Sequence, residues 1–121
     1  MYKKQVVGRF GEDVACKFLV KNGYKIVERN FCCRQGEIDI VAFDDKNGEF
    51  VFVEVKTRTS FSYGFPSEAV NKMKKRHILS SVKYYLYCKG LEDSFVRIDV
   101  IEVVVDVKHV KYKLNHLKGV F

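Results

Sequence analysis

Hydrophobic positions at the start of the chain recur at the spacing of an amphipathic helix. Between Val6 and Asn22, apolar side chains return every three or four residues, and Gly23 then supplies a helix stop. This pattern predicts a helix over residues 6–22 with one face turned to a core.

Three segments after this helix are predicted as strands, at residues 24–31, 37–43 and 49–57, because they are rich in β-branched and aromatic side chains. The alternation of the first is imperfect, since Ile26 and Val27 are adjacent. The polar cluster between the second and third ends in Asn-Gly, a strong hairpin signal. We therefore expect these two strands to pair antiparallel.

A second long helix is predicted from Ser67, a suitable N-cap, to the stop at Gly90. The β-branched run over 95–106 predicts a buried strand, and the alternation over 110–114 predicts a solvent-facing edge strand. The order α-β-β-β-α-β plus a C-terminal edge strand predicts an α/β fold, with a mixed β-sheet flanked by helices.

The length of 121 residues and the hydrophobic fraction of 47% suit one globular domain over residues 1–121 and argue against disorder. No apolar run approaches the ~20 residues that cross a bilayer. The segment Met1–Gln5 has no apolar signal-peptide core, so we expect a cytoplasmic protein. The four cysteines have no C-x-x-C spacing, which predicts reduced thiols and no zinc site.

Basic residues exceed acidic ones, 22 against 15, and give a formal net charge of +7. Clustered Lys and Arg are typical of a protein with a polyanionic partner such as nucleic acid. Solvated surface lysines would produce the same composition, so charge alone leaves both interpretations open.

Charged residues stand at one end of the third strand, where an interior strand should be apolar. Side chains alternate across a strand, so Glu54 and Lys56 share one face, as do Glu37 and Asp39 on the second strand. The hairpin would bring positions 37–39 close to 54–56. Three carboxylates and one ammonium would then gather at one end of a hydrophobic sheet.

This cluster has two interpretations. Opposite charges on an exposed sheet can form cross-strand ion pairs, with Lys56 reaching Glu37 and Asp39. Alternatively, Asp39 and Glu54 are the hard oxygen ligands that suit Mg²⁺, which keeps several waters. A metal-bound water is a stronger nucleophile, and Lys56 could orient or deprotonate it or offset charge on a phosphate.

Asp39, followed after a spacer by Glu54-Val55-Lys56, resembles the Asp…(Asp/Glu)-x-Lys signature of the restriction-endonuclease-like nucleases. The chain is most similar to the YraN family, a small bacterial branch related in fold to archaeal Holliday-junction resolvases. Ile38 stands where the superfamily often has Pro, which removes no ligand. The resemblance spans the whole chain, through Gly8–Glu12, Asn30 with Arg34, Gly36–Val41, Phe52–Arg58, Gly64, Arg97–Val100 and Asn115–Leu117.

The resemblance implies a restriction-endonuclease-like fold and a role for each matching residue. Asp39 and Glu54 would hold Mg²⁺, or Mn²⁺ as a substitute, with the Val55 carbonyl as a third contact. Lys56 would be the catalytic lysine.

Two further acids are expected near this site. By resemblance, Glu12 on the first helix would complete the catalytic set; as a plain first-turn acid it would instead be favoured by the helix dipole. Glu37 would be either a supporting acid beside the ligands or a partner for Arg34 or Lys56.

The basic run on the second long helix lies in its N-terminal half, where the helix dipole disfavours lysine, so we prefer phosphate contact to a solvated face. The aromatic loop residues Phe61, Tyr63 and Phe65 either stack on unpaired bases or pack against the core. The acidic hairpin tip, Asp44, Asp45 and Glu49, should point away from nucleic acid. The candidate nucleic-acid contacts are Arg34, Arg58, Ser60, Lys72, Lys74, Lys75 and Arg76.

These features predict a Mg²⁺-dependent endonuclease that hydrolyses phosphodiester bonds in DNA, with branched or recombination intermediates as the substrates that the resemblance suggests. A non-catalytic nucleic-acid-binding or accessory protein that retains the nuclease fold is the alternative, and a subunit that meets an acidic protein is a third. No helix-turn-helix or zinc-finger pattern is present, so we expect structure-selective or nonspecific recognition. By analogy with the resolvases, a homodimer is compatible with the chain, through the edge strand or the exposed helix.

Overall fold

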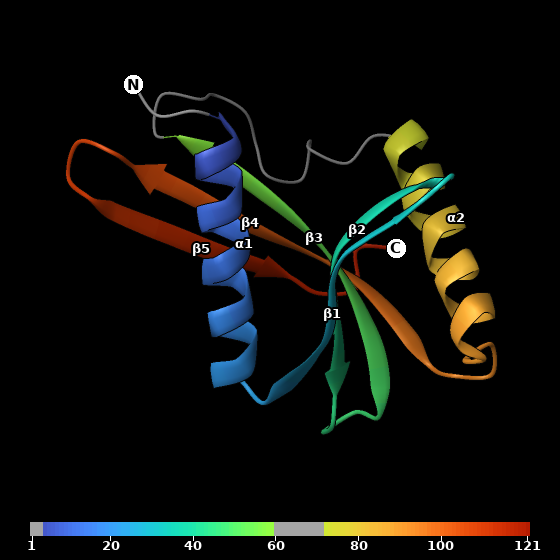
Figure 1. Ribbon diagram of the computed structural model, residues 1–121. Coiled ribbons are helices and arrows are strands. Elements are labelled where there is room, and N and C mark those ends of the chain that lie inside the picture. The colour runs from blue at the N-terminus through green and yellow to red at the C-terminus, as the bar shows by residue number, and fades with distance from the viewer. Residues whose placement is uncertain (1–3, 60–71) are drawn as a thin grey trace.

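Figure 1 shows the computed structural model, which describes residues 4–59 and 72–121, with side chains from Val6 in the first helix and from Lys75 in the second. The elements in chain order are α1 (Lys4–Lys21), β1 (Tyr24–Cys33), β2 (Gly36–Asp44), β3 (Glu49–Thr59), α2 (Lys72–Lys89), β4 (Val96–Asp106) and β5 (Lys111–Leu117).

The five strands form one sheet in the order β1-β2-β3-β4-β5. β3 and β4 are parallel, and every other neighbouring pair is antiparallel. A parallel pair needs a long crossover, which contains α2. The predicted α/β class, mixed sheet, element order and C-terminal edge strand are confirmed.

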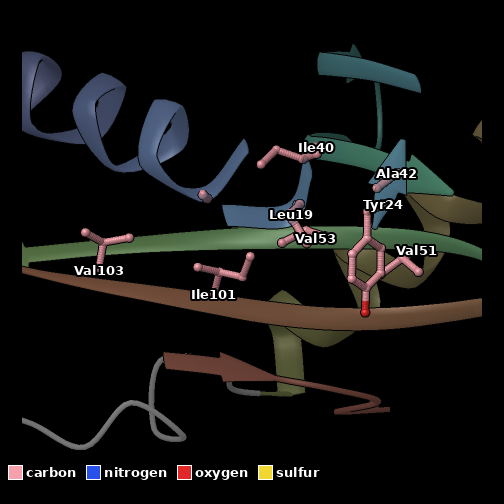
Figure 2. Packing of buried hydrophobic residues seen from close by; sticks show 9 residues of the cluster. Leu19, Tyr24, Ile40, Ala42, Val51, Val53, Ile101 and Val103 are labelled. Atoms are coloured by element: carbon pink, nitrogen blue, oxygen red, sulfur yellow. The ribbon is translucent and has the colours of Figure 1, made fainter. Parts of the chain in front are cut away.

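The two helices cover opposite faces of the sheet, so β3 is apolar on both sides over its first half. Val51 and Val53 pack toward α1 in a cluster with Leu19, which Figure 2 shows together with residues of β2 and β4. Phe52 packs toward α2 with Tyr85. This is the alternation expected of an interior strand, and each such side chain contributes about 1.5–3 kcal/mol when fully buried.

The hairpin between β2 and β3 sets the register around the site. Asp44 pairs with Glu49 at its closed end, and the ladder continues to Ile40 and Val53. In β1, the register against β2 shifts between Ile26 and Glu28, a bulge that places the extra residue, Val27, at the surface. This bulge explains why the alternation of apolar and polar residues breaks at Ile26 and Val27.

The first helix approaches β3 closely at Gly11, which is buried. A Cβ built at this position would overlap the Thr57 side chain. The missing side chain therefore lets α1 lie directly against the second half of β3, beside the charged residues of that strand.

A buried polar network joins the hairpin to the C-terminal strand on the α1 face. Arg97 donates to both carboxylate oxygens of Asp99, at 2.9 and 3.0 Å, and His116 Nε2 lies 2.7 Å from Asp99 Oδ2. Arg97 also forms ion pairs with Asp44 and Glu49, at 3.3 and 2.9 Å. Two of the three hairpin acids, Asp44 and Glu49, are thus tied to Arg97 by ion pairs.

The remaining differences from the sequence predictions concern segment ends. β5 begins at Lys111, because Val110 has a φ of 51° in the turn before it. The predicted N-cap Ser67 and the aromatic residues Phe61, Tyr63 and Phe65 lie outside the described residues. No helix in the described ranges is long and apolar enough to span a bilayer.

Substitution of Gly11 by Ala should destabilise the protein, because the added methyl group forces α1 away from Thr57. Overpacking of this kind costs about 1–3 kcal/mol, more than the ~1 kcal/mol that Ala gains over Gly in a helix. The free energy of unfolding from urea denaturation measures the difference.

The matched control is Gly8→Ala in the same helix, where an added Cβ meets nothing within 4 Å. That variant should be more stable than the wild type. Adding Thr57→Ala to Gly11→Ala removes two of the three overlapping atoms and should restore part of the loss. Equal effects of the two glycine substitutions would contradict the close approach.

Candidate functional site

The site begins where backbone pairing between β2 and β3 ends. The last ladder pair is Ile40 with Val53, and beyond it the Val55 amide donates to Asp39 Oδ2 at 2.8 Å. The carboxylate thus takes the acceptor role that a backbone carbonyl would have in a continued ladder. The expected approach of positions 37–39 to 54–56 is observed at Asp39 and Val55.

A hollow of about 250 Å³ opens at this point between the sheet and α2, lined by Gly36, Glu37, Asp39, Glu54, His77 and Ile78. The start of β2 lies tightly against the helix, since a Cβ on Gly36 would stand 3.1 Å from Ser81 Oγ. Gly36 also has a positive φ of 154°, which favours glycine. This contact holds α2 in place as one wall of the hollow.

Three carboxylates line the hollow, those of Glu37, Asp39 and Glu54. Burial and, after it, the negative charge of Glu54 raise the pKa of Asp39 to about 8, against the lowering effect of the hydrogen bond from the Val55 amide. Glu12 and Glu37 act in the same direction as Glu54. The acids therefore repel one another in a place where water cannot fully screen them.

Lys56 forms an ion pair with one of these acids, Glu54. Its Nζ lies 3.4 Å from Glu54 Oε1, two residues back on the same face of β3. Within the described ranges, Lys56 forms no ion pair with Glu37 or Asp39, and Glu37 forms none with Arg34. The interpretation as cross-strand ion pairs is therefore wrong: the pair runs along one strand because side chains two apart share a face.

Glu12 adds its charge from the α1 side. Burial raises its pKa, the nearby Arg29 lowers it, and Glu37 raises it again. Arg29 Nη2 lies 3.8 Å from Glu12 Oε1. Asn30 of β1 is a hydrogen-bond partner of Glu12 and has a positive φ of 53°. Its two neighbours in β1 pair with Ile38 and Ile40, on either side of Asp39. Glu12 thus lies close enough to act on Asp39 but faces a separate, more open depression.

The donor set at the hollow fits a hard divalent cation. In the part of the chain that the structure describes, no three His, Cys, Asp or Glu side chains converge as a ready metal cage. Mg²⁺ needs only one or two carboxylates, because it keeps most of its waters. Asp39 and Glu54 offer that number, and a cation between them would relieve the repulsion that raises the pKa of Asp39.

Comparison with known proteins places the chain in a family. A family model described as "Uncharacterised protein family UPF0102" matches residues 11–103. The chain belongs to the UPF0102 (YraN) family. It is 47% identical over 120 residues to a UPF0102 protein of Clostridium perfringens, across 99% of this chain and 96% of that protein. A UPF0102 protein of Caldicellulosiruptor bescii is 47% identical over 116 residues, across 95% of this chain and 96% of the relative.

Among solved structures, a repair endonuclease from Pyrococcus abyssi is similar to 88% of this chain and 39% of its own, with a TM-score of 0.37 and 17% identity. A likeness of this size carries no argument about activity. The family membership confirms the resemblance to YraN proteins that the sequence motifs indicate.

The predicted nucleic-acid contacts of this UPF0102 protein are only partly described. Arg58 lies half-buried on the same face of β3 as Lys56, and Arg34 is exposed between β1 and β2. Lys75 and Arg76 are exposed near the start of α2, next to the hollow, with Lys75 Nζ 4.7 Å from the centre of the Phe121 ring. Ser60 and the side chains of Lys72 and Lys74 lie outside the described residues.

Two groups in the UPF0102 protein were not singled out from its sequence as site residues. His77 of the second helix lines the hollow with Asp39 and Glu54. Glu102 is buried in β4, opposite Lys56 in the ladder. The sequence offered one signal for Glu102, an acidic residue between the apolar Ile101 and Val103. For His77 the signal was its position directly after three basic residues.

The raised pKa of Asp39 predicts a pH-dependent stability difference. Because the folded-state pKa of about 8 exceeds the unfolded value of about 3.9, the stability that Asp39 contributes is complete below pH ~4 and lost as pH rises through 8. The free energy of unfolding of Asp39→Asn should therefore increase relative to that of the wild type as the pH rises from 5 to 8. We expect at least about 1 kcal/mol of change, since one pKa unit equals 1.36 kcal/mol.

Urea denaturation with EDTA at several pH values measures this gain. Asp93→Asn, an exposed acid between α2 and β4, is the control and should show no such trend. A difference between Asp39→Asn and the wild type that stays constant with pH would refute the buried, repelled carboxylate.

Proposed function

We propose that this protein is a divalent-cation-dependent endonuclease that hydrolyses phosphodiester bonds in DNA. The observation that carries the proposal is the placement of Asp39, Glu54 and Lys56 together, just beyond the half of β3 that is apolar on both faces. Acids forced together at a cost in stability are typical of functional sites. The family resemblance assigns the same three residues to nuclease chemistry.

Asp39 and Glu54 would hold Mg²⁺, or Mn²⁺ in its place, with the Val55 carbonyl as the third protein contact. When bound there, the ion would supply a bound water of lowered pKa and positive charge opposite the phosphate. The Val55 amide fixes one oxygen of Asp39, so this carboxylate is oriented before any ligand arrives.

Lys56 would stand beside the attacked phosphate and offset the negative charge that develops on it. Its ammonium already lies next to Glu54, on the side of β3 that faces the hollow. Glu12 would act from the α1 side as the acid that completes the set, and Glu37 would support the ligands from the rim of the hollow.

The substrate is proposed to be DNA with a branched structure, such as a recombination intermediate. Support comes from the net charge of +7 and from the basic residues around the hollow, of which Arg76 and Lys75 are exposed on α2. A homodimer would supply the two sites that paired cuts need, with the sheet edge at β5 as a candidate interface.

Cleavage should depend on the cation and on Lys56. Four-way junction, flap, duplex, single-stranded DNA and RNA substrates are incubated with Mg²⁺ or Mn²⁺, and with EDTA. We expect cutting of branched DNA that EDTA abolishes and that Lys56→Ala lowers by roughly 10²-fold or more, the usual effect of removing one group that stabilises transition-state charge. Lys46→Ala, exposed in the turn between β2 and β3, is the matched control.

Failure to cut any substrate with either metal, while salt-sensitive DNA binding persists, would favour the non-catalytic nucleic-acid-binding protein. Cutting that Lys56→Ala leaves unchanged would indicate a contaminating nuclease. Cutting of RNA alone would correct the substrate and keep the chemistry.

DNA binding should weaken steeply with salt. The logarithm of the binding constant is expected to fall by about 0.9 per logarithm of salt for each duplex phosphate contacted. Arg76→Ala should lower this slope by about one contact, whereas Lys17→Ala on α1 should leave it unchanged. Fluorescence anisotropy from low to high salt in EDTA gives the slopes, and a flat response in the wild type would refute backbone contact.

A further inference from the structure

Glu102 is a buried carboxyl group that the proposed reaction has not yet used. Only 3% of the residue is exposed, and its Oε1 is buried with no hydrogen-bond partner in the described part of the chain. Its neighbours Ile101 and Val103 are fully buried apolar residues. A buried carboxyl oxygen without a partner costs stability, so its presence between two core residues requires a reason.

The register of the sheet places Glu102 directly beside Lys56. β3 and β4 are parallel, and Lys56 pairs with Glu102. Side chains at paired positions project from the same face, and Ile101 and Val103 pack in the cluster on the other face, with α1. Adjacent strands are about 4.8 Å apart, well within the length of a lysine side chain.

The environment of Glu102 holds its pKa above the ordinary value, and one nearby positive charge opposes this shift. Burial raises the pKa of Glu102, and Arg58, two residues beyond Lys56 on the same face of β3, lowers it. A second positive group beside this carboxyl would lower its pKa further.

Lys56 now has one ion-pair acceptor among the described residues, Glu54 Oε1 at 3.4 Å. Under the proposed function, Glu54 must turn its oxygens to a divalent cation. The Lys56 ammonium would then lose that acceptor and be repelled by the new charge. Glu102 Oε1 is an acceptor on the same face of the sheet, at the paired position, that no described group occupies.

We propose that Glu102 is the positioning residue for Lys56: its carboxylate receives the Lys56 ammonium when Glu54 binds the divalent cation. The inference rests on the proposed function and adds to it a second ion-pair partner for Lys56. Lys56 would thereby stay beside the site without competing with the cation for Glu54.

Binding of Mn²⁺ tests this without any cleavage measurement. Isothermal titration calorimetry compares the wild type, Glu102→Gln, Lys56→Met and the double variant. Glu102→Gln removes the negative charge that would hold the ammonium and leaves only a neutral amide oxygen, so Mn²⁺ should bind roughly tenfold more weakly, the size of coupling seen between contacting charged groups. In the Lys56→Met background no ammonium has to move, and the same substitution should change the affinity by less than about twofold.

Glu92→Gln, an exposed acid just after α2, is the matched control for the loss of one negative charge and should bind Mn²⁺ as the wild type does. Thermal melts establish that each variant is folded. If Glu102→Gln does not fold, Glu102→Met replaces it, because apolar residues of similar volume commonly substitute for a buried charge.

Each outcome separates this inference from the function on which it rests. An unchanged affinity in Glu102→Gln would overturn it. Equal losses with and without Lys56 would also overturn it, since Glu102 would then act on the cation directly. If the wild type binds Mn²⁺ no better than Asp39→Asn does, the proposed cation site itself is refuted, and the relocation of Lys56 with it.

Discussion

The hydrogen bond from the Val55 amide to Asp39 is the contact on which the site depends. It replaces the backbone pairing of β2 with β3 at the point where that ladder stops, so the two strands stay together while a carboxylate takes the place of a carbonyl. Asp39 is thereby held beside Glu54, and the pKa of Asp39 rises to about 8. Without this bond the two carboxylates would be free to separate.

The rest of the fold supplies the stability that offsets the cost of holding Asp39 and Glu54 close together. Over its first half β3 is buried on both faces, by α1 and by α2, and this apolar half anchors the strand. Gly11 lets α1 lie against Thr57, and Gly36 lets α2 lie against the start of β2, so both helices reach the charged half as well. Burial there is what shifts the pKa values of Asp39 and Glu12.

The fold could be predicted from local sequence patterns, because each pattern depends only on residues that are neighbours in the chain. The Asn-Gly turn specified the hairpin, and alternation in β3 specified its two apolar faces. The adjacent apolar pair in β1 signalled an irregularity, but a bulge is visible only against the partner strand. The acids of the hairpin were expected to point away from nucleic acid, and the ion pairs of Asp44 and Glu49 with Arg97, 48 residues beyond Glu49, could not be predicted from the turn itself.

For the candidate site, the sequence by itself determined which residue types share a face: Asp39 with Glu37, and Glu54 with Lys56. That follows from the period of two along a strand, a purely local rule. Only the tertiary structure decided which of them pair, that Lys56 meets Glu54 instead of crossing to β2, and that His77 and Glu102 join them. Those contacts depend on strand register, on a parallel crossover and on helix placement, which bring distant segments together and which no short stretch of sequence encodes.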